Sequence, residues 1–122
     1  MRDTIKKHAD FITADTDPMA RSAYFIVRAK NARFAENPRI GFTATKHTFK
    51  LAVHRNRAKR LMRDWVRFYS DLLAPEFDYV FIARAPILEA TRDLGREAMF
   101  KALKHIMRKY APKNEHNREK FK

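Results

Sequence analysis

LAVHRNRAKRLMRDWVRFYSDLL, residues 51–73, is the longest helical pattern in the sequence. Successive residues of an α-helix lie about 100° apart, and on that spacing the apolar side chains of this stretch fall within one arc of roughly 120°. This apolar arc comprises Ala58, Leu61, Met62, Trp65, Phe68, Tyr69 and Leu72. The stretch therefore predicts an amphipathic helix whose apolar side packs against the core.

The same helix carries a cationic stripe on its opposite side. An arc of roughly 100° contains Asn56, Lys59, Arg60, Arg63 and Arg67. Solvated helix faces commonly mix charges of both signs, whereas like charges on one face repel each other, and only Asp64 lies nearby to offset them. We therefore expect an anionic partner, because guanidinium groups suit bidentate contact with phosphate. A plain solvated face is the alternative, and Asn56 is equally suited to capping the helix start.

The composition of the chain agrees with an anionic partner. Its 122 residues include 27 Lys and Arg against 14 Asp and Glu, which gives a formal net charge of +13. Nucleic acid is the first candidate partner and a membrane surface the second. No apolar run approaches the roughly 20 residues that span a bilayer, and the charged N-terminus is unlike a secretory signal. Because the sequence also lacks cysteine, we expect a cytoplasmic protein without disulfides or Cys-based zinc sites.

Predicted strands flank the central helix. Residues 23–30 (AYFIVRAK) and 39–45 (RIGFTAT) precede it and are rich in β-forming residues, and residues 78–84 (DYVFIAR) follow it. The first two strands are predicted to form an antiparallel pair, joined by an exposed loop over residues 31–38.

Two further helices are predicted near the ends of the chain. Residues 4–14 show a short helical pattern, and another helix runs from about Thr91, a residue type suited to N-capping, to Tyr110. The order α-β-β-α-β-α predicts one α+β domain over residues 1–111, built as a small two-layer sandwich. Residues 112–122 are predicted to form a flexible basic tail.

The sequence contains no pattern typical of a catalytic or metal centre. The five histidines lack metal-ligand spacing, the carboxylates show no catalytic pairing, and two glycines cannot build a Gly-rich phosphate loop. We therefore predict no catalytic residue, no bound metal and no nuclease activity of the protein alone. Gly41, inside a strand, predicts a bulge or a close backbone approach, whereas Gly95 indicates nothing specific.

Aromatic residues divide between core and surface. Trp65, Phe68 and Phe100 lie on or beside apolar helical faces and are predicted to be core residues. A core position and an exposed sheet face are about equally compatible with Phe11, Tyr24, Phe25 and Val27.

Three segments together resemble one known family. RNRAKRLMR (residues 55–63) looks like the RNR signature of the protein subunit of bacterial ribonuclease P. RIGFTATK (39–46) and DYVFIAR (78–84) resemble the strands before and after that helix in the family. The likeness covers roughly residues 11–109, and three motifs in the right order are much more specific than the RNR string alone.

The resemblance implies a fold similar to domain 2 of ribosomal protein S5 and a role in removing 5′ leaders from precursor tRNA. In that family the catalytic RNA holds the active site, the RNR helix faces this RNA, and a cleft takes the single-stranded leader. The implied partners are the catalytic RNA and precursor tRNA. The resemblance also implies Mg²⁺ for the holoenzyme, no cofactor bound by the protein alone, and no activity without the RNA.

The resemblance and the cationic stripe together nominate site residues. The expected RNA-binding residues are Arg55, Asn56, Arg57, Lys59, Arg60, Arg63 and Arg67, the last from the stripe alone. The expected residues of the leader cleft are Phe11, Phe25 and Val27.

Two other functions compete with this interpretation. A structural RNA-binding protein of the ribosomal type would share the size and charge, and specific stimulation of precursor-tRNA cleavage would separate the two. A helix-turn-helix DNA reader needs two helices joined by a tight turn, whereas strands flank the basic helix here. DNA and membranes are therefore not expected as partners.

Overall fold

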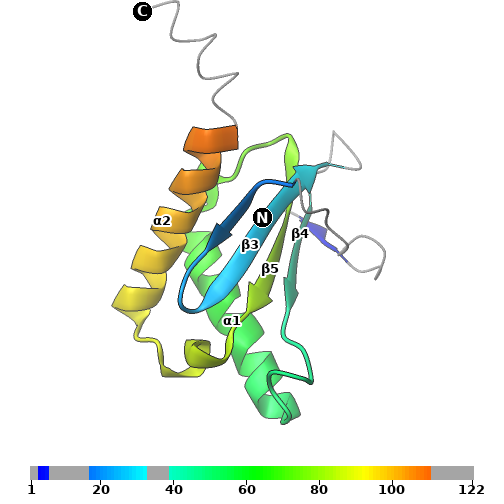
Figure 1. Ribbon diagram of the computed structural model, residues 1–122, viewed down its shortest axis with the longest axis vertical. Coiled ribbons are helices and arrows are strands. Elements are labelled where there is room, and N and C mark those ends of the chain that lie inside the picture. The colour runs from blue at the N-terminus through cyan, green and yellow to red at the C-terminus, as the bar shows by residue number, and fades with distance from the viewer. Residues whose placement is uncertain (1–2, 6–16, 33–38, 111–122) are drawn as a thin grey trace, which may run out of the picture.

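The computed structural model describes residues 3–5, 17–32 and 39–110, which form one sheet and two long helices (Figure 1). The strands are β1 (Asp3–Thr4), β2 (Met19–Arg21), β3 (Phe25–Asn31), β4 (Arg39–Thr43) and β5 (Phe77–Ala83). The helices are α1 (Ala52–Phe68) and α2 (Arg92–Tyr110), with short 3-10 helices η2 (Ser70–Leu72) and η3 (Ala85–Glu89). The strand order in the sheet is β1-β4-β5-β3-β2.

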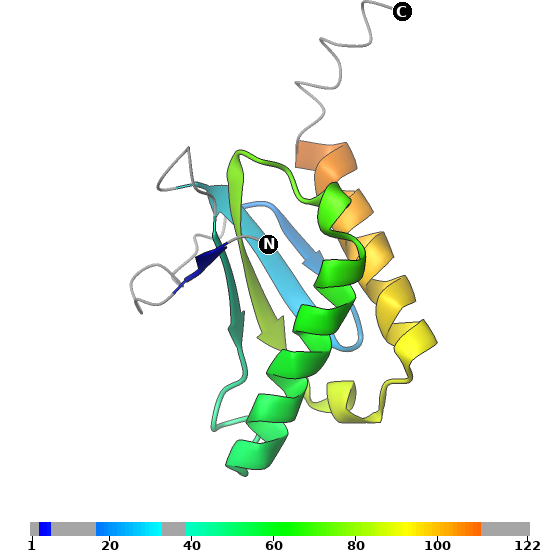
Figure 2. The ribbon, with the colours of Figure 1, turned by 180° about the vertical axis from the view of Figure 1, so that it is seen from behind.

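Both long helices lie on one face of the sheet (Figure 2). There α1 contacts β4 and β5, α2 contacts β2, and the two helices contact each other. This arrangement confirms the predicted two-layer α+β class. Of the helices in the described residues, none is long and apolar enough to cross a membrane.

β5 separates the two strands that were predicted to pair. β3 runs antiparallel to β5, whereas β4 runs parallel to β5, so the predicted β3–β4 pairing is wrong. The physical reason is burial: six of the seven residues of β5 are buried, and a strand that is apolar on both faces suits the middle of a sheet. The parallel step from β4 to β5 requires a crossover, and α1 supplies it.

The N-terminal segment begins with a strand rather than a helix. Thr4 of β1 pairs with Ile40 of β4, and the Ile5 N–H donates to the Ile40 carbonyl at 2.9 Å, so the predicted helix start at Thr4 is wrong. The rest of that predicted helix, residues 33–38 of the predicted loop and the predicted tail lie outside the described residues. β2 has no counterpart among the predicted strands, because a three-residue edge strand is too short to show alternation.

The core between the sheet and the helices is rich in aromatic rings. The indole of Trp65, which is 2% exposed, lies with its centroid 6.4 Å from the ring of Phe25 and 6.2 Å from that of Tyr24. Most of the predicted apolar arc faces this core, with Ala58 and Met62 buried and Leu61, Tyr69 and Leu72 partly buried. The exception is Phe68, which is 57% exposed. The periodicity thus predicted the packing side of α1 correctly, apart from its edge.

The start of α2 is fixed by a cap and by a close helix contact. The Thr91 hydroxyl accepts a hydrogen bond from the Leu94 N–H at 3.2 Å, which confirms the predicted N-cap. Gly95, one turn later, lies against the Trp65 indole so closely that a Cβ atom would overlap the ring carbons. Gly95 therefore permits the close approach of α2 to α1. Gly41, by contrast, pairs in regular register with Val80, so the predicted bulge is absent there.

Candidate nucleic-acid interface

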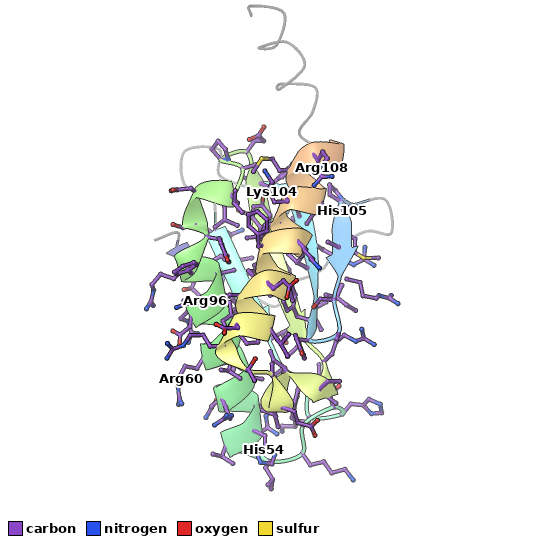
Figure 3. All side chains as sticks on the ribbon, turned by 90° about the vertical axis from the view of Figure 1, so that its left-hand side faces the viewer. His54, Arg60, Arg96, Lys104, His105 and Arg108 are labelled. Atoms are coloured by element: carbon purple, nitrogen blue, oxygen red, sulfur yellow. The ribbon has the colours of Figure 1, made fainter. Side chains whose placement is uncertain are left out.

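The cationic stripe is exposed along α1. Asn56, Arg60, Arg63 and Arg67 are exposed and Lys59 is half-buried, while the opposite side of the helix is anchored in the core. Arg60 projects outward from α1 (Figure 3). Asp64 lies 4.0 Å from Arg67, but an exposed i,i+3 pair of this kind contributes only about 0.3–0.5 kcal/mol, so a phosphate can displace it.

A hydrogen-bonded loop over residues 44–51 leads into the start of α1. In this loop the Phe49 N–H donates to the Thr45 carbonyl at 2.9 Å, and the Thr48 N–H donates to the Thr45 hydroxyl at 3.2 Å. The first turns of α1 that follow extend beyond the end of the sheet (Figure 2), which opens them to a large partner. The Phe49 ring is buried. The loop thus sets the orientation in which α1 meets a partner.

Arg55 is tied to this loop. Its Nη1 donates to the Phe49 carbonyl at 2.9 Å and to the Lys50 carbonyl at 3.1 Å. The N-cap residue, Leu51, offers no side-chain hydrogen bond, so Arg55 takes part in fastening the helix start from within the first turn. A positioning role is therefore visible for Arg55, while its predicted contact with RNA stays a prediction.

The stripe continues toward the sheet through Arg63. Its guanidinium lies 5.2 Å from the ring centroid of Phe42 on β4, a cation–π distance. Because the side chain rests on a buried aromatic ring, less conformational freedom is lost when it binds a phosphate. Arg57 is also exposed on α1, on the side that faces α2.

The structure contradicts the predicted leader cleft at Phe25 and Val27, two of its three residues. Phe25 and Val27 are fully buried and face the helices, because alternate residues of β3 point into the core against Trp65 and Phe81. They cannot line an open groove. Phe11 lies outside the described residues.

The sheet face opposite the helices carries different residues. Ile26 and Arg28 of β3, Ile82 of β5 and Thr43 of β4 are half-buried there, and Ile26 pairs with Ile82 across the two strands. No helix of the described residues covers this face (Figures 1 and 2). The expected cleft residues Phe25 and Val27 lie on the other side of β3, which faces the helices.

Two aromatic side chains expected in the core lie at the surface. Phe68 is 57% exposed and Phe100 is 41% exposed. The Arg96 guanidinium lies 3.9 Å from the centroid of Phe68, and the Lys104 ammonium lies 5.9 Å from that of Phe100. Arg96 was not among the predicted site residues, because its partner is on another helix and periodicity within one helix cannot reveal it.

The charge and exposure of the α1 surface suit anion binding. Among residues 3–5, 17–32 and 39–110, no three His, Cys, Asp or Glu side chains lie close enough together to hold a metal ion. What α1 offers is a rigid row of guanidinium and ammonium groups at the surface. Such a row binds phosphates at several points along a nucleic-acid backbone.

Arg55→Ala and Arg60→Ala are expected to separate positioning from binding. Arg55→Ala removes two hydrogen bonds from a charged group, which we expect to lower the free energy of unfolding by about 1–2 kcal/mol. Arg60→Ala removes only an exposed, repelled charge, so the stability should stay level or rise slightly while affinity for RNA falls. Urea unfolding and RNA titration of both variants measure the two effects. Equal losses of stability would contradict this division.

Comparisons with known proteins point to one family. The family model described as Ribonuclease P matches residues 2–110. The ribonuclease P protein component of Brucella suis is 32% identical over 106 residues, covering 75% of this chain and 74% of the relative. That of Caulobacter vibrioides is 44% identical over 82 residues, covering 66% and 54% of the two chains.

Solved structures agree with the sequence comparisons. The structure of the Staphylococcus aureus RNase P protein superimposes with a TM-score of 0.66 at 27% identity, covering 83% of this chain and 92% of that chain. The RNase P protein from Thermotoga maritima shares the fold with a TM-score of 0.58 at 21% identity, over 70% and 80% of the two chains. The chain belongs to the bacterial ribonuclease P protein family.

Proposed function

We propose that the chain acts as the ribonuclease P protein component by laying the exposed face of α1 on the catalytic RNA. Proteins of this family work with the catalytic RNA in maturing the 5′ ends of tRNA, and family membership favours that role over a ribosomal-type structural one. The observation that carries the proposal is the cationic stripe, held rigid by the buried side of the same helix. The RNA supplies the reaction centre and holds the Mg²⁺ of the holoenzyme.

The leader of precursor tRNA is proposed to lie on the sheet face opposite the helices. Arg28 gives this face a positive charge beside the apolar side chains of Ile26 and Ile82. A strand of unpaired nucleotides suits such a surface, because its bases pack on apolar groups while cations hold its phosphates. From the family resemblance alone, Phe11 is proposed to contact the leader as well.

The test compares precursor and mature tRNA. A bacterial ribonuclease P RNA is assayed with and without the protein, at low Mg²⁺, on tRNA that carries or lacks a leader of a few nucleotides. The protein should stimulate cleavage and make the complex favour the leader-bearing tRNA. Arg28→Ala should reduce that preference roughly 5- to 8-fold at 0.1 M salt, the value of one phosphate contact.

Two further variants sharpen the result. Phe11→Ala should also reduce the preference for the leader. Lys101→Ala, an exposed charge on α2 on the other side of the sheet, should leave it unchanged. A preference that does not depend on the protein, or that survives both Arg28→Ala and Phe11→Ala, places the leader elsewhere and leaves only the α1 surface.

A further inference from the structure

We propose that the groove between α1 and α2 is a second binding surface for the backbone of the catalytic RNA. This inference rests on the proposed function and extends it to a helix that the RNR motif does not include. The groove encloses about 850 Å³ and is lined by Arg57, Arg67 and Phe68 from α1 and by Arg92 and Arg96 from α2. Its two walls are far apart in the sequence and adjacent in the fold (Figure 3).

The charge of the groove selects an anionic occupant. Four arginines line it against one acid, Asp64, whose carboxylate is already paired weakly with Arg67. The groove also lies at the first turn of α2, where the helix dipole adds positive potential that Asp93 partly offsets. Four guanidinium groups around one open groove repel each other, and phosphate oxygens relieve that repulsion.

The exposed ring of Phe68 positions Arg96, one of the four arginines of the groove. The Phe68 ring is exposed, which normally costs free energy, yet the Arg96 guanidinium lies over it at 3.9 Å. A second ring, Tyr69, meets Phe68 edge-on with centroids 4.8 Å apart and supports it. Contact with the ring restrains the Arg96 side chain, so less conformational freedom is lost when its N–H donors bind a phosphate.

The position of the groove favours the catalytic RNA as its occupant. Arg67 belongs both to the cationic stripe and to the groove, so the two surfaces are continuous around α1. An RNA backbone that lies on the stripe therefore reaches Arg92 and Arg96 without crossing an uncharged gap. The proposed leader surface, in contrast, is on the far side of the sheet.

The experiment measures the affinity of the full chain for a bacterial ribonuclease P RNA, without substrate. Arg92→Ala combined with Arg96→Ala should weaken binding roughly 20- to 60-fold at 0.1 M monovalent salt. The slope of log K against log salt should become shallower by roughly 1.4–1.8, which corresponds to two lost phosphate contacts. Arg96→Lys, which keeps the charge but not the planar stack on Phe68, should recover most of the slope and only part of the affinity.

The matched control is Lys101→Ala combined with Arg108→Ala. It removes the same charge from exposed positions on α2 outside the groove, and should weaken binding less than about 3-fold because distant charges are screened. An equal loss in this control would show that net charge alone matters and would overturn the proposal. Thermal melts verify that all variants fold.

The remaining outcomes distinguish the groove from the α1 stripe. If Arg60→Ala combined with Arg63→Ala weakens RNA binding but the groove variant does not, the groove proposal fails and the proposed function stands. If neither weakens binding, both fail. A groove variant that binds the catalytic RNA normally, but whose holoenzyme loses affinity for precursor tRNA, would assign the groove to substrate and overturn the proposal.

Discussion

Raising the monovalent salt concentration from 0.05 to 0.2 M is expected to weaken binding of this protein to the catalytic RNA by roughly 100- to 500-fold. The four cations of the stripe together with Arg57 on the same helix offer about five phosphate contacts, and each contributes roughly −0.7 to −0.9 to the slope of log K against log salt. The cations of α1 therefore predict a slope of roughly −3.5 to −4.5. Contacts in the groove between α1 and α2 steepen it further.

The measurement is a titration of labelled RNA at several salt concentrations and fixed Mg²⁺. Arg60→Ala combined with Arg63→Ala serves as the internal comparison, since removing two contacts should reduce the steepness by roughly 1.4–1.8. A slope near zero would contradict the phosphate-binding role of α1, because affinity would then come from uncharged contacts.

Gly95→Ala is expected to destabilise the fold by about 3 kcal/mol or more. Helix propensity alone predicts the opposite sign, a gain of about 1 kcal/mol on replacing Gly within a helix. The added methyl group, however, would overlap the Trp65 indole, which is buried and confined between Tyr24 and Phe25. Overpacking in a rigid core commonly costs about 1–3 kcal/mol, and a ring that cannot move away places this site at or above the upper end.

Urea unfolding of the single and combined variants checks this result. Trp65→Phe should lower stability by itself, but it should also reduce the cost of Gly95→Ala, because the smaller ring leaves room for the methyl group. Lys101→Ala, at an exposed position of the same helix, should change stability by less than about 0.5 kcal/mol. If Gly95→Ala costs the same with Trp65 present as it does in the Trp65→Phe variant, the helix contact is not the cause.

Local patterns predicted the elements that carry their own periodic signal. The long helix, its buried side at Met62 and its exposed side at Arg60 follow from residue spacing alone. Thr91 was identified as a cap because capping involves neighbouring residues only. The order of the strands could not be derived in this way, since it depends on how β5 competes with β3 and β4 for the centre of the sheet.

Features that depend on two distant segments were the ones missed. The need for glycine at position 95 can be inferred only once Trp65 is known to lie against it. Likewise, the exposure of Phe68 is explained only by Arg96, which covers its ring from the other helix. Phe25 was placed in the leader cleft because a strand that is apolar on both sides does not reveal which side the helices cover. The candidate site was therefore predictable along α1 and not across the sheet or between helices.

The crossover position of α1 links RNA binding to the cooperativity of folding. Since α1 connects β4 to β5 and buries Ala58, Met62, Trp65 and Val66 in the core, the helix that we propose to bind the RNA folds together with the sheet. Any ligand that binds only this folded form stabilises the whole domain by mass action, by about 2.7 kcal/mol at a free concentration 100 times Kd. Bound RNA therefore shifts the folding equilibrium toward the native state. It should protect the protein from proteolysis and slow amide hydrogen exchange at sites well away from the surface that the RNA covers.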